Sequence, residues 1–200
     1  MAGSRRIQQM VRRAQRFMAT CLDRAYRTTS HAAATALAGI PSVEFLAMMY
    51  AENYRRTEEL RQGNKNGTGL ARATAFAREQ ARQRLFLRWK MQLEGTTGRS
   101  GKRVADAIRP CLQKSVGRAH EDLTFQTPQV LTGHGCFGEY LHRVVRKECT
   151  SRCHHCSAAE DTAQHTLGVC PAWDRQRRVL TSVVGADLSP PALIRAILKG

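Results

Sequence analysis

Three cysteines and one histidine near the end of the chain have the spacing of a metal site. Written as ligands, the pattern is C-x2-C-x8-H-x4-C, formed by Cys153, Cys156, His165 and Cys170. Two thiolates separated by two residues bind one ion from a single tight turn, and this spacing recurs in structural zinc sites. Four ligands complete a tetrahedron, whereas catalytic zinc usually keeps one position for water. The sequence therefore predicts a structural Zn²⁺.

Two other interpretations of these cysteines stay open: buried apolar thiols and disulfides. The odd count of seven cysteines and the absence of a secretory-type apolar run favour zinc thiolates in a reducing compartment. Cys149, His154 and His155 lie close enough in the sequence to exchange into the ligand set, and we expect them instead to support the ligands from outside or to lie in solvent. The cysteines left over are expected to be free and mostly buried: Cys21, Cys111, Cys136 and Cys149.

The 200-residue chain is strongly basic, with 32 Lys and Arg against 16 Asp and Glu and a formal net charge of +16. Such a surface attracts polyanions, so nucleic acid is the expected partner. Apolar residues make up 42% of the sequence, which is enough for a core, while strand-forming runs are rare. No apolar run approaches the length of a membrane span, so we expect no membrane partner. The expected fold is mainly α, an irregular helical array with a small C-terminal CCHC zinc-knuckle-like module.

Apolar residues recur at three- and four-residue steps, and this spacing predicts the helices that position the ligands. A short helix starting at 158–162 should carry His165, and Cys170 with Pro171 should end it. Residues 94–103 are expected to form a loop, and 120–125 a short extended piece. Further helices are expected at 4–26, 32–37, 43–60, 70–93, 103–113 with an interruption at Pro110, 128–131, 139–145, 173–184 and 192–198.

The expected organisation has four parts, separated at a glycine-rich linker that covers residues 63–69. A basic helical segment occupies 1–62, and its arginine-rich start also fits a mitochondrial transit peptide, although the basic pattern continues far beyond one. A helical connector occupies 70–145. The zinc module with the C-terminal helices occupies 146–200.

Several aromatic and apolar residues are expected to face a core. The stripe of Phe45, Met49, Tyr50 and Tyr54 has the spacing of a buried helical face, which favours core packing over a stacking platform. Core packing is likewise expected for Trp89 and Trp173. The helix at 139–145 should point Tyr140, Leu141 and Val144 inward.

Candidate nucleic-acid contacts are cations on the predicted helices and beside the zinc ligands. His134 stands between two glycines, but no nucleophile pairs with it at a recognisable spacing, so a structural role is expected. The candidate contacts are Arg5, Arg6, Arg12, Arg13, Arg16, Arg78, Arg82, Arg88, Arg143, Arg146 and Lys147.

Three segments carry a resemblance to a known family: residues 131–143 with Gly133-His134-Gly135, the CCHC cluster, and Cys170-Pro171-Ala172-Trp173. They closely resemble the C-terminal region of non-LTR retrotransposon polyproteins, nearest to arthropod elements that insert into ribosomal DNA. Residues 24–30 and 33–41 resemble the segment that follows the reverse transcriptase core. By this resemblance Cys153, Cys156, His165 and Cys170 match the family's zinc ligands. The resemblance also implies residence in the nucleus, with a cytoplasmic ribonucleoprotein stage as the alternative, and partnership with polymerase and endonuclease domains.

The chemistry of that family, which nicks target DNA and copies RNA at the nick, has no matching residues here. The sequence has no Phe/Tyr-x-Asp-Asp motif and no carboxylate cluster for two-metal phosphoryl transfer, so no enzyme is expected. The leading hypothesis is a zinc-stabilised fragment that binds RNA or DNA phosphates. The rival hypothesis is a zinc-stabilised protein-interaction module without direct nucleic-acid contact.

Overall fold

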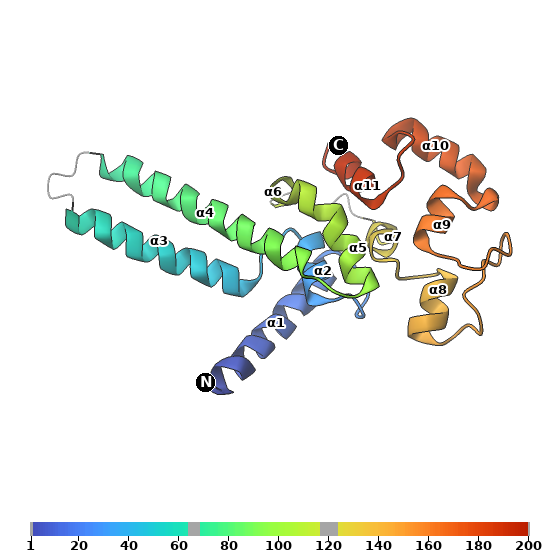
Figure 1. Cartoon of the computed structure of the whole chain (residues 1–200), viewed down its shortest axis with the longest axis horizontal. Coiled ribbons are helices and arrows are strands. Elements are labelled where there is room, and N and C mark those ends of the chain that lie inside the picture. Colours follow the sequence, from blue (N-terminus) through green and yellow to red (C-terminus); the bar gives the residue numbers. More distant parts are fainter. Residues whose placement is uncertain (1, 64–68, 117–123, 200) are drawn as a thin grey trace.

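The computed structural model describes residues 2–63, 69–116 and 124–199, and all regular structure in these ranges is helical (Figure 1). The mainly α prediction is confirmed. Most of the extended piece expected at 120–125, and most of the linker at 63–69, lie outside the described residues. Within those ranges, no helix has both the length and the apolar character that a membrane span requires.

The first half of the chain forms four helices: α1 (Ala2–Leu22), α2 (His31–Leu37), α3 (Val43–Gly63) and α4 (Leu70–Glu94). Helices α3 and α4 lie side by side as a long antiparallel hairpin that projects from the rest of the molecule (Figure 1). Helix α2 begins where the Ser30 hydroxyl accepts a hydrogen bond from the Ala33 backbone N–H, the usual contact of an N-cap serine.

The second half of the chain begins with α5 (Arg99–Ile108), a 3₁₀ turn η1 (Arg109–Cys111) and α6 (Leu112–Ser115). The interruption predicted at Pro110 therefore occurs, because proline has no N–H for the regular helical bond. The loop predicted at 94–103 is too long, since α5 already starts at Arg99. Glycine-rich sequence favoured a loop there, but α5 buries Val104 and Ile108 completely, and this packing overrides the local preference.

The remaining elements are short, apart from α10. They are α7 (Gln126–Thr132), α8 (Gly138–Tyr140), the π-helical turn η2 (Leu141–Val145), α9 (Ala163–Gly168), the 3₁₀ turn η3 (Pro171–Trp173), α10 (Asp174–Val184) and α11 (Pro190–Ile197). The predicted inward direction is right for Tyr140, which is buried, and wrong for Val144, which is 51% exposed. Val144 lies on the π-helical turn η2, whose residue spacing differs from that of the α-helix assumed in the prediction.

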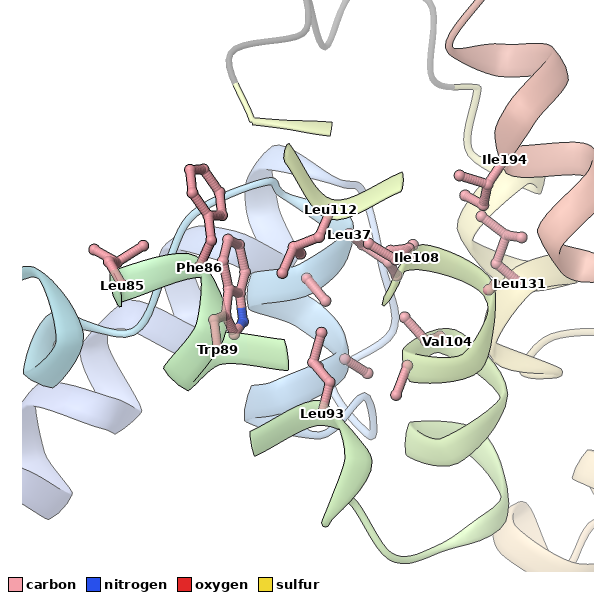
Figure 2. Close-up of a cluster of buried hydrophobic side chains, with 14 residues drawn as sticks. Leu37, Leu85, Phe86, Trp89, Leu93, Val104, Ile108, Leu112, Leu131 and Ile194 are labelled. Carbon is pink, nitrogen blue, oxygen red and sulfur yellow. The ribbon is translucent and has the colours of Figure 1, made fainter. Parts of the chain in front are cut away.

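The hydrophobic core lies where α2, α4, α5, α6, α7 and α11 meet (Figure 2). Trp89 is fully buried in this cluster, as the sequence predicts, and its ring stacks on Phe86 with centroids 6.5 Å apart. At one side Ile194 of α11 faces Leu131 of α7 (Figure 2). Side chains from residues 1–62, 70–145 and 146–200 thus share one core.

Helix α1 packs against α2 through Gln15 and through Ala19, which is fully buried in a small cluster with Ala34 and Ala38. Gln15 is buried, and its side chain bonds the Pro41 carbonyl at 2.8 Å, the His31 ring at 3.0 Å and the Val43 N–H at 3.2 Å. The apolar face of α1 points away from the core, so that Ile7 and Phe17 are 62% and 66% exposed. The satisfied amide of Gln15 and the small buried side chain of Ala19 together set the orientation of α1, which the spacing of its large apolar residues does not reveal.

The stripe predicted to be core on α3 divides in two. Phe45 and Met49 are half-buried and pack against the core cluster. Tyr50 and Tyr54 are 65% and 71% exposed, so the prediction is wrong for both tyrosines. Because the hairpin extends beyond the core, the outer turns of α3 pack against α4 and against no other helix among the described residues.

Candidate metal centre

The structure brings Cys153, Cys156, His165 and Cys170 together, with one ligand atom of each within 4.8 Å of all the others. The sulfurs of Cys153 and Cys170 are 3.9 Å apart, and Cys156 Sγ lies 3.2 Å from His165 Nε2. Tetrahedral zinc with Zn–S bonds of about 2.3 Å requires sulfurs about 3.8 Å apart. Three sulfurs and one imidazole nitrogen at these separations can therefore hold a single tetrahedral metal ion.

The first two ligands come from a tight turn. The Ser157 N–H donates to the Cys153 carbonyl at 2.9 Å, and the Cys153 N–H donates to the Ala158 carbonyl at 2.9 Å. Ser157 takes a positive φ of 60°, which reverses the chain directly after Cys156. These bonds fix both sulfurs on the same side of the turn.

The other two ligands come from α9 and the residue just after it. Thr162 caps α9, its hydroxyl accepting the His165 N–H at 3.0 Å, and the Cys170 N–H donates to the His165 carbonyl at 2.8 Å. The predicted helix start at 158–162 ends at the observed N-cap, because Thr162 caps a helix that begins at Ala163. The prediction that a short helix carries His165 is right.

Asp161 organises this region and was not singled out from the sequence. Its carboxylate accepts the Gly138 N–H at 2.9 Å and the Thr166 hydroxyl at 3.1 Å, and its N–H donates to the Ser151 carbonyl at 2.7 Å. A Cβ on Gly138 would lie 3.0 Å from the Arg152 carbonyl oxygen and 3.2 Å from Asp161 Cβ, so glycine is needed there. The feature of the sequence that could have pointed to Asp161 is its position directly before Thr162, a residue type that often caps helices.

The sulfurs differ in how easily they lose a proton. The Ala158 backbone N–H donates to Cys156 Sγ and lowers the pKa of Cys156, because it stabilises the thiolate. Burial raises the pKa of Cys170, because the thiolate loses its hydration. A bound cation would compensate for this burial, since metal ligands of this kind are thiolates.

The neighbouring residues lie around the cluster. Cys149 is exposed, His154 Nε2 lies 3.7 Å from a Glu148 carboxylate oxygen, and the His155 ring packs edge-on against Trp173 with centroids 5.2 Å apart. Trp173 is half-buried by this contact. The expectation that the remaining cysteines are mostly buried is wrong: Cys21, Cys136 and Cys149 are exposed and Cys111 is half-buried.

His134 joins the module to the rest of the protein. It is buried, its ring stacks on Tyr140 with centroids 4.6 Å apart, and both residues share the Thr28 hydroxyl, at 3.2 Å from His134 Nδ1 and 3.0 Å from the Tyr140 hydroxyl. Gly133, at a φ of 72°, ends α7 directly before it. Burial lowers the pKa of His134, because the charged imidazolium would lose its hydration.

The candidate nucleic-acid contacts fall on three separate parts of the molecule. Arg5, Arg6, Arg12, Arg13 and Arg16 lie on α1, where the Arg12 guanidinium pairs with Glu44. This pairing holds the pKa of Glu44 below its usual value, although burial of that carboxyl works in the opposite direction and is the largest single effect.

The other candidates lie on the hairpin and the metal module. Arg78 and Arg82 line one side of the α3–α4 hairpin and Arg88 lines the other. Arg143 pairs with Glu160 at 2.8 Å, while Arg146 and Lys147 are exposed beside it. The structure thus brings Arg78 and Arg82 together and keeps the three groups apart.

The fold and the cluster define a small helical protein with a Cys₃His cluster that could hold a metal ion. The chain is similar to the retrovirus-related Pol polyprotein from the type-1 retrotransposable element R1 4 of Nasonia vitripennis, with 28% identity over 183 residues. The match covers 85% of this chain and 43% of that polyprotein, so the chain spans less than half of its relative's length. No family model and no solved structure matches. The predicted relation to a non-LTR retrotransposon polyprotein region is confirmed.

Proposed function

We propose that this retrotransposon-related chain is a nucleic-acid-binding module that contacts RNA or DNA phosphates through Arg and Lys and is stabilised by structural Zn²⁺. Its partners would include the polymerase and endonuclease parts of a polyprotein, and its place of action would be the nucleus. Zinc is the metal proposed because thiolate and imidazole ligands in a closed tetrahedral set are typical of structural zinc sites. Zinc would supply folding free energy here and take no part in chemistry.

The observation that carries this proposal is a groove between α3 and α4. The groove, about 540 Å³ in volume, has Tyr50, Tyr54, Arg78 and Arg82 in its lining. Glu58 and Arg61 line it too, and they pair with each other at 2.8 Å. Both tyrosines are mostly exposed, and in the described part of the chain no carboxylate lies within 4.0 Å of Arg78 or Arg82. Exposed aromatic rings beside uncompensated guanidinium groups are the combination by which proteins stack bases and hold phosphates.

The test is salt-dependent binding of RNA and duplex DNA to the purified chain. Binding should weaken steeply as salt rises, because released counterions drive phosphate contacts. The double variant Arg78→Gln/Arg82→Gln should reduce the magnitude of the slope of log K against log salt by about 1–2, which means a weaker salt dependence. Arg56→Gln, which removes a cation already paired with Glu59 at 2.9 Å, is the matched control and should change the slope little. Binding that stays constant between low and moderate salt would rule the proposal out.

The second candidate function is a protein-interaction module, which the exposed apolar face of α1 favours. Ile7, Met10, Phe17 and Met18 have exposed fractions between 59% and 66%. Trp89 is fully buried and cannot be an exposed anchor. If the double arginine variant binds nucleic acid normally while Phe17→Ala loses association with the rest of a related polyprotein, this second function replaces the first.

A further inference from the structure

A cavity separate from the α3–α4 groove lies between the helical core and the metal module. It has a volume of about 550 Å³ and is lined by Arg103 of α5, His134, Glu139, Tyr140, Arg143 and Thr162. Pockets of roughly 300–1,000 Å³ accommodate small molecules and single nucleotides. The walls come from α5, from the end of α7, from α8 and η2, and from the N-cap of α9, so the cavity exists only when the metal module is folded against the core.

Arg103 is the residue in this cavity whose charge has no partner. It is half-buried, and its Nε donates to the Val130 carbonyl at 3.4 Å while its Nη2 donates to the Gln164 side-chain oxygen at 3.2 Å. Both acceptors are neutral, and among the described residues no carboxylate lies within 4.0 Å of the guanidinium. Burial accordingly lowers the pKa of Arg103, although an arginine remains charged at neutral pH. A partly desolvated cation without a counter-ion favours an anion in the adjoining cavity.

Arg143, the second guanidinium at the cavity, is compensated. Its Nη2 bonds Glu160 at 2.8 Å and its Nε lies 3.8 Å from Glu139. Arg103 is therefore the guanidinium of this cavity that has no carboxylate within 4.0 Å among the described residues.

The cavity also has an aromatic part in its lining. His134 and Tyr140 stack on each other at an interplanar angle of 29°, and the Thr28 hydroxyl hydrogen-bonds both side chains. The ring pair is buried, so it offers an apolar wall rather than an exposed stacking face. A planar base can lie against such a wall while its phosphate reaches Arg103.

We infer that this cavity binds one unstacked nucleotide of a single-stranded nucleic acid, with the phosphate on Arg103 and the base against the His134–Tyr140 pair. The inference rests on the proposed nucleic-acid function and deepens it, since it adds a preference for single strands. A base in a duplex is paired and stacked and cannot enter, whereas the α3–α4 groove holds phosphates of either form. The cavity would thus distinguish strand states that the groove does not.

The experiment compares binding of one short single-stranded oligonucleotide and its duplex to the full chain. Arg103→Gln should weaken single-strand binding about tenfold and leave duplex binding unchanged, because it removes one charge-assisted contact. Arg88→Gln, on the hairpin side away from the cavity, is the matched control and should affect both forms alike. Arg103→Lys, which keeps the charge, should retain most of the single-strand affinity, and an unaltered thermal midpoint verifies that the variants fold.

A free nucleoside 5′-monophosphate provides the second probe. It should raise the thermal midpoint of the wild-type chain and leave that of Arg103→Gln unchanged. Equal losses for single strand and duplex in Arg103→Gln, or a monophosphate effect no larger than that of inorganic phosphate, would overturn the nucleotide site. In that case salt-dependent binding lost in Arg78→Gln/Arg82→Gln would still support the proposed function, so the two failures are distinguishable.

Discussion

Removal of the metal should unfold one part of this protein and leave another part folded. Between residues 141 and 187, all of which the structure describes, the only buried residues are Cys153, Asp161, Ala163 and Cys170. This segment buries no large aliphatic side chain, each of which would contribute about 1.5–3 kcal/mol. Structural zinc contributes about 10–16 kcal/mol in zinc-finger peptides. A zinc ion bound as proposed would therefore be the main source of order in the segment, whereas the core around Trp89 has its own apolar packing.

The two tryptophans allow the two parts to be observed separately. Trp173 lies in the metal module against His155, and Trp89 lies in the core. Chelation should change the tryptophan fluorescence of the wild-type chain, and the Cys153→Ser variant should show the same change without chelation. In the Trp173→Phe variant only Trp89 emits, so chelation should leave its fluorescence unchanged. Circular dichroism should fall only slightly, because α9 and α10 contribute 6 and 11 residues whereas α3 and α4 contribute 21 and 25.

Two results would refute this reasoning. Unaltered fluorescence and circular dichroism after complete loss of zinc would show that the module is ordered without the ion. A change in Trp89 emission in the Trp173→Phe variant would show that the core also depends on it.

Three further predictions concern single side chains. Ile194→Ala should lower the free energy of unfolding by about 2–5 kcal/mol in urea titration, because Ile194 is fully buried against Leu131, and a loss below 1 kcal/mol would contradict the packing described. Burial lowers the pKa of His134 below 6.5, so its contribution to stability is complete above pH 6.5 and is lost as pH falls through the lower folded-state value. His134→Gln should therefore flatten the decline of the thermal midpoint in acid. Equal declines in the wild-type chain and the variant would count against this prediction. Thr162→Ala should cost about 1 kcal/mol and weaken zinc affinity about fivefold in competition titration, since it removes the cap of the helix that carries His165, whereas unchanged affinity would show that the cap is dispensable.

The sequence predicts those features that depend on local spacing. The four metal ligands lie within eighteen consecutive residues, so their separation in the chain largely determines their separation in space. Helix periodicity likewise predicts α3 and α4, and it identifies Trp89 as a core residue. The resemblance to a retrotransposon polyprotein also follows from short contiguous motifs.

Features that depend on distant contacts are the ones that sequence reasoning missed. The exposure of Tyr50 and Tyr54 depends on how far the hairpin extends beyond the core. The orientation of α1 depends on Gln15, whose partners Pro41 and His31 are up to 26 residues away. Neither effect has a signature in the hydrophobic pattern of a single helix.

Helix α11 completes a core that α2, α4 and α5 begin. In the sequence, the metal-binding segment lies between α5 and α11. Because Ile194 packs against Leu131, the core remains open until residue 194 has left the ribosome. The metal-binding segment therefore emerges before the core is closed. Zinc binding during synthesis would order the segment that connects α7 to α11 and so shorten the loop that closes when α11 docks. A shortage of zinc would then delay the closing of the hydrophobic core, although the core does not contact the ion.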